Sequence, residues 1–273
     1  MLTNRIKLLW IILSAIALLG SCQKEEVDMK IPEGETGTTV KGRIVTNGDV
    51  GLAGIRLEIN YTRSTPNILG GSLKRLKSTG TTDKNGAFSL SLYLQDDELT
   101  KEEGYFKSYY LQFDMSALDR EKYILPGDLD ADPADLTHMS YIELKRDTTY
   151  ETNFYLPLKR YIPVTLKGYQ RTNRTNFTVY TTFPWGFEKG DNYIGMQGEV
   201  IDTQWQERSC PIGLFRSEGG DVTFTNIPFA LNDTTIVNVW RTYDDGTSGI
   251  EHVKIFVTET KPETLSFDFA PGT

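Results

Sequence analysis

Histidine and cysteine, the residues most often used in catalysis and in binding transition metals, are scarce in this sequence. Two of each occur among 273 residues. His138 and His252 lie far apart, and neither has sequence neighbours that suggest a metal site or a catalytic triad. Gly-x-Ser-x-Gly, phosphate-loop and His-Glu-x-x-His motifs are also absent from the sequence. We therefore expect a protein that is not an enzyme, with a glycoside hydrolase built on two carboxylates as the remote alternative.

Positive charge and helical periodicity are also underrepresented. The net charge is −8, which argues against nucleic acid and anionic lipid as partners. Only 96–103 and 116–123 have patterns that predict short helices.

The longest apolar run, Leu8–Leu19, is shorter than the roughly 20 residues of a membrane-spanning helix. Arg5 and Lys7 precede it, so residues 1–21 have the parts of a secretory signal. Leu19-Gly20-Ser21-Cys22 resembles the lipobox of bacterial lipoproteins. This resemblance implies cleavage before Cys22 and acyl chains that anchor that cysteine to a membrane. The alternative is an ordinary export signal with a cysteine there by chance.

The residues after Cys22 predict where the protein is displayed and how it is attached. Gln23-Lys24-Glu25-Glu26 is similar to the acidic export tag of Bacteroidetes surface lipoproteins, which implies an outer-membrane protein on the cell surface. A solvated spacer on a periplasm-facing anchor is the alternative. The stretch Glu33–Gly37 is polar, follows Pro32 and contains two glycines, so residues 22–37 are predicted to form a flexible tether. If Cys22 is acylated, Cys210 has no intrachain disulfide partner.

Period-two alternation of apolar and polar residues runs through the rest of the chain. It is clear at 55–61, 88–94, 109–113 and 177–183, and it predicts strands with one buried face. The fold class expected is all-β, with two tandem antiparallel β-sandwich domains over 38–158 and 159–273. Within this scheme Trp240, inside a predicted strand, is expected in the core.

Part of the first predicted domain resembles a known family. Thr39–Val45, Leu52–Leu57 and Thr81–Leu90 are similar to carboxypeptidase regulatory-like domains, with Asn85-Gly86 at a hairpin turn. The resemblance covers residues 39–94 and implies a transthyretin-like sandwich that is an accessory module without an active site. The second domain resembles only a generic immunoglobulin-like sandwich. These resemblances favour a surface binding or accessory module of a glycan- or nutrient-uptake assembly, with a glycan or an outer-membrane protein as partner. A structural or adhesive subunit of a surface complex or fimbria is the alternative.

Two segments contain candidate ligand sites. Aromatic residues near a Pro-Trp-Gly sequence can form a platform that stacks on sugar rings, or they can fill the core: Trp185, Phe187, Tyr193 and Trp205. Four closely spaced carboxylates can converge on Ca²⁺, or they can form a solvated acidic loop: Asp128, Asp130, Asp132 and Asp135. No other cofactor is expected.

Overall fold

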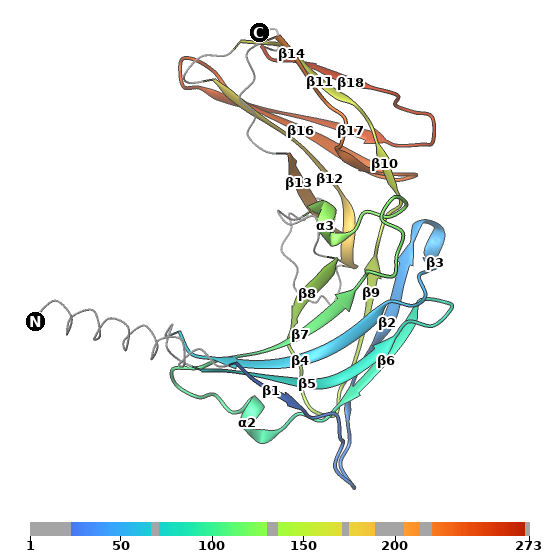
Figure 1. Cartoon of the computed structure of the whole chain (residues 1–273), viewed down its shortest axis with the longest axis vertical. Coiled ribbons are helices and arrows are strands. Elements are labelled where there is room, and N and C mark those ends of the chain that lie inside the picture. Colours follow the sequence, from blue (N-terminus) through green and yellow to red (C-terminus); the bar gives the residue numbers. More distant parts are fainter. Residues whose placement is uncertain are drawn as a thin grey trace, which may run out of the picture.

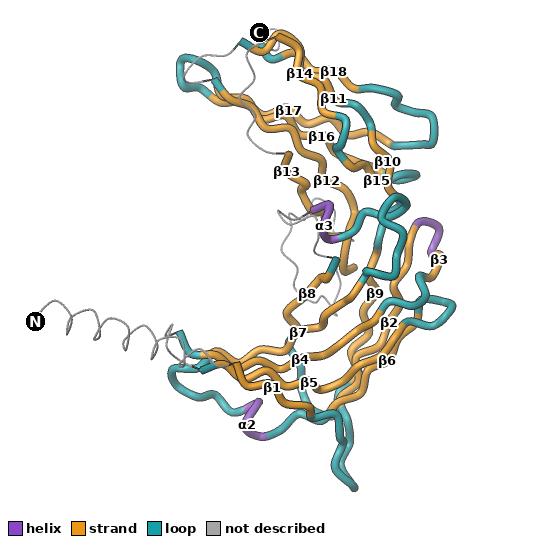
Figure 2. The backbone as a smooth tube through the Cα atoms, viewed as in Figure 1, coloured by secondary structure: helices purple, strands orange, loops and turns teal. Residues whose placement is uncertain are grey.

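The computed structural model describes residues 23–66, 71–129, 136–170, 175–188, 205–212 and 220–270. Strands dominate these residues, which confirms the all-β fold class, and they form two sandwiches (Figures 1 and 2). In this part of the chain no helix has both the length and the apolar character needed to cross a membrane.

A five-stranded sheet forms one layer of the first sandwich. Its strands, in spatial order, are β1 (Gln23–Val27), β5 (Ser72–Thr81), β4 (Arg56–Ser64), β7 (Phe106–Asp114) and β8 (Thr137–Ile142). The opposite layer contains β6 (Ala87–Leu92), β2 (Thr38–Thr46), β9 (Thr149–Tyr155) and the two-residue β3 (Val50–Gly51), with a short 3-10 turn η1 (Asn47–Asp49) between β2 and β3. The first core lies between these layers and includes Ile44, Leu57, Ile59, Leu90 and Phe154.

The second sandwich has its own core, which includes Leu166, Tyr169, Phe177, Val239 and Phe267. Its strands are β11 (Val164–Tyr169), β14 (Gly220–Phe224), β18 (Leu265–Asp268), β12 (Asn176–Glu188), β13 (Trp205–Ile212), β16 (Thr234–Thr242) and β17 (Ser248–Phe256). A small ladder of β10 (Lys159–Tyr161) and β15 (Pro228–Ala230) lies near the junction. Among the described strands three pairs are parallel, namely β1–β5, β2–β9 and β11–β18, so the sheets are mixed and not purely antiparallel as expected.

Strand β12 joins the two sandwiches. Its first half pairs with β16, while Gly186 and Phe187 near its end pair with β9 of the first sandwich. Phe183, Trp185 and Phe187 consequently belong to the first core, although they follow the expected boundary at Leu158. The second half of the chain therefore completes the core of the first.

Strand β1 contradicts part of the predicted tether. The flexible 22–37 interpretation is wrong for residues 23–28, because Gln23–Val27 form a parallel ladder with β5 and the Asp28 amide donates to the carbonyl of Leu76 at 2.9 Å. Ion pairs between side chains hold this strand in place, including Arg75–Glu26 at 2.7 Å. The first sandwich thus begins at the residue that follows Cys22.

Three predicted local features have different outcomes. Gly86 has a φ of +74° at the expected hairpin turn, and a Cβ there would lie 2.2 Å from the carbonyl oxygen of Ile44, so only glycine fits. The helix expected at 96–103 is reduced to one turn, α2 (Asp96–Leu99). The helix expected at 116–123 is wrong, because this segment forms consecutive turns; a second single turn, α3 (Pro126–Leu129), follows it.

Candidate ligand-binding face

The five-stranded sheet has an outer face that points away from the first core. Along β4, Leu57, Ile59 and Tyr61 point into the core, so the residues between them point outward. We call this surface the open face; the residues that form its centre are Glu25, Lys74, Leu76, Arg56, Glu58, Asn60, Tyr110, Gln112, Asp114, Thr137, Met139 and Tyr141. Their register across five strands, which is set by backbone pairing, brings together residues that are distant in sequence.

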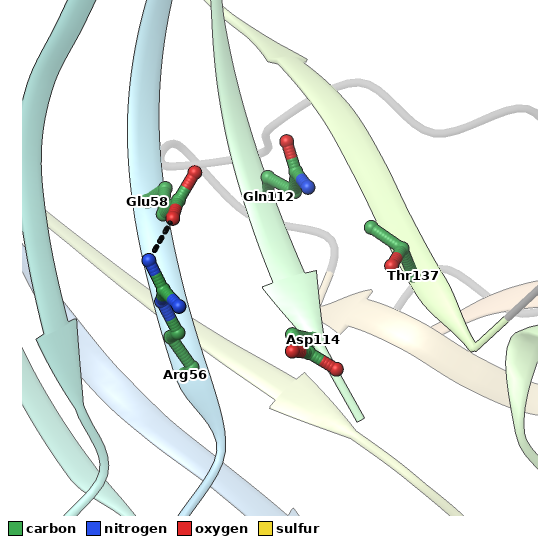
Figure 3. A pocket seen from close by; sticks show the side chains of 5 residues that line it. All are labelled: Arg56, Glu58, Gln112, Asp114 and Thr137. Atoms are coloured by element: carbon green, nitrogen blue, oxygen red, sulfur yellow. Dashed lines mark hydrogen bonds and ion pairs between the residues drawn. The ribbon is translucent and has the colours of Figure 1, made fainter. Parts of the chain in front are cut away.

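The first of two adjoining depressions on this face has a volume of about 220 Å³. Arg56 and Glu58 from β4, Gln112 and Asp114 from β7, and Thr137 from β8 line it (Figure 3). The Arg56 guanidinium donates to the Glu58 carboxylate at 2.7 Å. This depression therefore offers a guanidinium, an amide, a hydroxyl and two carboxylates within one small area.

Asn60 lies in the second depression, which has a volume of about 190 Å³ and shares Glu58 with the first. The side chain of Asn60 is 2 % exposed, and no donor in the described part of the chain reaches its Oδ1. Its Nδ2 has only long contacts, each of 3.5 Å, to Glu58 and Gln112. A buried amide oxygen without a hydrogen-bond partner costs about 1–3 kcal/mol of stability.

Aromatic rings lie directly beside Asn60. Tyr110 is the cross-strand neighbour of Asn60 and packs edge-to-face on Tyr141, with 6.2 Å between the ring centroids. Tyr141 is 48 % exposed and Met139 is 57 % exposed. Aromatic rings pack against the apolar C–H face of a ligand, and amide groups beside them bind its hydroxyls. The two together therefore suit a ligand that has both.

The carboxylate of Asp114 is suited to accept hydrogen bonds. The hydroxyl and the backbone N–H of Ser116 both donate to it and lower its pKa, so Asp114 is ionised at neutral pH. A general acid for glycoside cleavage needs a raised pKa instead. Asp114 is therefore suited to accept hydrogen bonds and not to act as such a general acid.

The predicted aromatic platform is wrong for Trp185 and Phe187. Both side chains are fully buried in the first core, and the Trp185 indole N–H donates to the carbonyl of Ile124 at 3.0 Å. Neither ring can stack on an external sugar. Tyr193 lies outside the described residues, and for Trp205 the structure gives only its backbone position in β13.

The predicted calcium loop is described at one position only. Asp128 accepts from the backbone N–H of Leu125 at 3.0 Å and pairs with Lys159 at 3.1 Å. Asp130, Asp132 and Asp135 lie outside the described residues. Within the described ranges, no cluster of three or more His, Cys, Asp or Glu side chains could hold a metal ion. Calcium binding therefore remains a prediction.

The sequence contains a signal for the open face that is an alternation pattern and not a motif. Arg56, Glu58 and Asn60 alternate with apolar residues, as do Tyr110, Gln112 and Asp114, and this pattern marks the wet side of two strands. The alternation itself does not show which strands with a solvent-exposed face lie side by side, or in what register they pair.

No family model matches the chain, and a search of curated proteins also finds no match. Solved structures give distant similarities. The Streptococcal ancillary pilin has 10% identity and a TM-score of 0.28, with 88% of this chain and 64% of that chain covered. This chain therefore spans less than two thirds of that pilin.

Two further solved structures are similar at the same level. The shaft pilin SpaA of Lactobacillus rhamnosus GG has 13% identity and a TM-score of 0.26, with 85% of this chain and 96% of that chain covered. A candidate cell adhesion protein from Bacteroides ovatus has 9% identity and a TM-score of 0.22, with 81% and 87% covered. Similarity this low carries no functional argument.

Proposed function

We propose that this protein is a non-catalytic, lipid-anchored binding protein of the cell surface, and that its open face binds a polyhydroxylated ligand, that is, a glycan. The observation that carries the glycan proposal is the pair of adjoining polar depressions, which share Glu58 and are lined by Gln112 in the first and Asn60 in the second. Exposed Tyr141 supplies a ring for the apolar face of a sugar, while Gln112 and Asp114 supply partners for its hydroxyls. Membership of a glycan-uptake assembly is consistent with this role.

A glycan array tests the binding site. The probe is the soluble chain 23–273, which keeps β1 in its sheet, and the hits are then measured by calorimetry. We expect Asn60→Ala and Tyr141→Ala each to weaken binding of a selected glycan by about tenfold or more, as loss of one good polar or stacking contact implies. Trp240→Ala, which removes an exposed aromatic from the second sandwich, is the matched control and should bind normally.

The stability of Asn60→Ala separates a binding role from a structural one. Because this variant removes a buried polar group that is poorly satisfied, we expect its unfolding free energy to be unchanged or higher, although binding is lost. A variant that loses both stability and binding would place Asn60 among the structural residues. A glycan hit that is insensitive to both substitutions would move the site elsewhere.

The lipid anchor is supported by the signal and lipobox resemblance, and its test is Cys22→Ala. We expect the acylated chain to sediment with membranes and to float with them in a density gradient, because several acyl chains anchor durably. The Cys22→Ala variant should be released into the soluble fraction. Firm membrane attachment of this variant would refute acylation at Cys22.

One observation favours the alternative of a structural or adhesive subunit. Among the described residues β17 pairs only with β16, so it is an edge strand of nine residues. Trp240 and Ile250, which face each other across these strands, are about half exposed. Such an edge can pair with a strand from another subunit. Sedimentation velocity would show concentration-dependent assembly, which Ile250→Lys on the edge strand should weaken.

A further inference from the structure

One end of the five-stranded sheet lies next to the predicted lipid anchor. The register places Gln23 of β1, Ser72 of β5, Ser64 of β4 and Phe106 of β7 in a single row across the sheet. Cys22 is bonded to Gln23, so its Cα lies about 3.8 Å from the Cα of Gln23. Acyl chains on Cys22 would therefore attach at this end of the sheet, and not at the end of a tether.

Buried ion pairs keep β1 from swinging away from the sheet. Lys77 is fully buried and pairs with Glu98 of α2 at 2.9 Å and with Asp28, which follows β1. Arg75, which is also largely buried, pairs with Glu26 on β1 and with Glu98. Together with the residue pairs of the β1–β5 ladder, these ion pairs fix the position of β1 relative to the sheet.

Two aromatic side chains are exposed at the same end. Phe106 is 64 % exposed and Tyr105 is 37 % exposed, with the Arg63 guanidinium 4.0 Å above the Tyr105 ring centroid. Three strand spacings of about 4.8 Å separate Phe106 from Gln23, which gives roughly 14 Å in the plane of the sheet end. This distance is short enough for the rings and the acyl chains to meet the same membrane surface.

The charges around these rings are largely compensated. Glu102 pairs with Arg63 and with Lys107, each at 3.0 Å. Exposed Lys101 and Glu103, of opposite sign, lie in the same loop. Paired charges with exposed aromatic rings suit the interfacial zone of a bilayer, where Tyr is enriched, and do not require anionic lipid.

We propose that Tyr105 and Phe106 contact the bilayer surface next to acylated Cys22, so that the sheet stands on the membrane with its strands directed away from it. This inference rests on the proposed acylation. Arg56 lies eight residues along β4 from Ser64, so the first depression of the open face would lie roughly 26 Å above the membrane at about 3.3 Å per residue. The open face would then stand side-on to the surface, where an extended ligand can reach it.

Lipid-quenched fluorescence tests the contact. The protein is the acylated full chain, purified from membranes. It carries Cys210→Ser, and Phe106→Cys is labelled with an environment-sensitive nitrobenzoxadiazole dye. The labelled protein is reconstituted in phosphatidylcholine vesicles that contain doxyl lipid. The matched control is Met139→Cys with the same label, since Met139 is similarly exposed on the same sheet but farther along the strands. We expect doxyl lipid to quench the dye at position 106 at least twofold more strongly than at position 139.

Vesicle flotation distinguishes the two possible failures. Equal quenching at both positions, with the protein floating with the vesicles, would overturn the contact and leave the acylation intact. Failure of the unlabelled wild-type chain to float would overturn the acylation and, with it, this inference.

Discussion

Trp185 and Trp240 have the same side chain in opposite surroundings. The Trp185 ring lies 5.0 Å from the rings of both Phe154 and His138, at the centre of the first core. Trp240 is 51 % exposed and faces Ile250 on the surface of the second sandwich. The energetic cost of removing each ring should therefore differ greatly.

We expect Trp185→Ala to lower the free energy of unfolding by about 3–5 kcal/mol, because it leaves a large cavity and an unpaired Ile124 carbonyl. Trp240→Ala should change it by no more than about 0.5 kcal/mol. Urea unfolding monitored by circular dichroism measures both values. Similar values for the two variants would contradict the burial of Trp185.

The sequence leaves Trp185 open between a surface platform and the core and predicts Trp240 in the core, whereas the structure buries Trp185 and exposes Trp240 for local reasons. Pro184 and Gly186 around Trp185 predicted a loop, but they lie inside β12, where the pairing with β13 becomes irregular after Pro184. Gly and Pro within a strand often mark such an irregularity. For Trp240, alternation with buried Val237 and Val239 indicates an outward position, which the sequence pattern would have predicted if applied to that strand alone.

At the scale of secondary-structure elements, β1 depends on charge more than on apolar burial. The Lys24 ammonium and the Arg75 guanidinium both donate to the Glu26 carboxylate and lower its pKa from 4.5 to about 2. Because its pKa is lowered in the folded state, ionised Glu26 stabilises the docked strand at pH values above its ordinary pKa. That stabilisation declines as the pH falls from 4.5 towards 2.

We therefore expect β1 to loosen in acid before the cores unfold. The amide of Asp28, which donates to Leu76, reports on this strand, and its hydrogen exchange, corrected for the intrinsic rate, should accelerate between pH 4.5 and about 2. In the Glu26→Gln variant the same amide should exchange faster already at neutral pH. Constant protection of wild-type Asp28 across this range would rule out a role for the Glu26 charge.

The sequence predicted most of the strands with alternation but not β1. Gln23-Lys24-Glu25-Glu26 consists of residues with low β propensity, and a single valine follows. The strand forms because Arg75 and Lys77 on β5 provide buried partners for Glu26 and Asp28, a contact between segments about 50 residues apart. Complementarity over such a distance is not visible in either segment alone.

At the scale of the whole molecule, β12 makes the two sandwiches interdependent. A chain that ends at Leu158 lacks Phe183, Trp185 and Phe187 from the first core. Burial of each ring contributes about 1.5–3 kcal/mol, so their combined loss is comparable to the total stability of a typical domain, about 5–15 kcal/mol.

We expect the fragment 23–158 to be unfolded or molten, and the chain 23–273 to unfold in one cooperative transition. Calorimetry and near-ultraviolet circular dichroism of both chains provide the measurement. A fragment that melts within a few degrees of the full chain would show that the first sandwich is autonomous after all.

Fold class and many strands of this molecule follow from local patterns, whereas its connections do not. Alternation identified β4, β7 and most of β12 as strands, but it could not show that one strand, β12, serves two cores. The open face also depends on contacts that local patterns do not show. Asn60 and Tyr110 are 50 residues apart and become neighbours only through strand register.

The parallel pairing of β1 with β5 also determines how the protein would respond to mechanical force. If Cys22 is acylated and the open face binds a ligand, as proposed, a pull between the two acts along the axis of β1. All five residue pairs of the β1–β5 ladder then resist in shear at the same time, whereas a perpendicular pull would break them one after another. The attachment would thus be strongest along the direction in which a cell tethered to its ligand pulls.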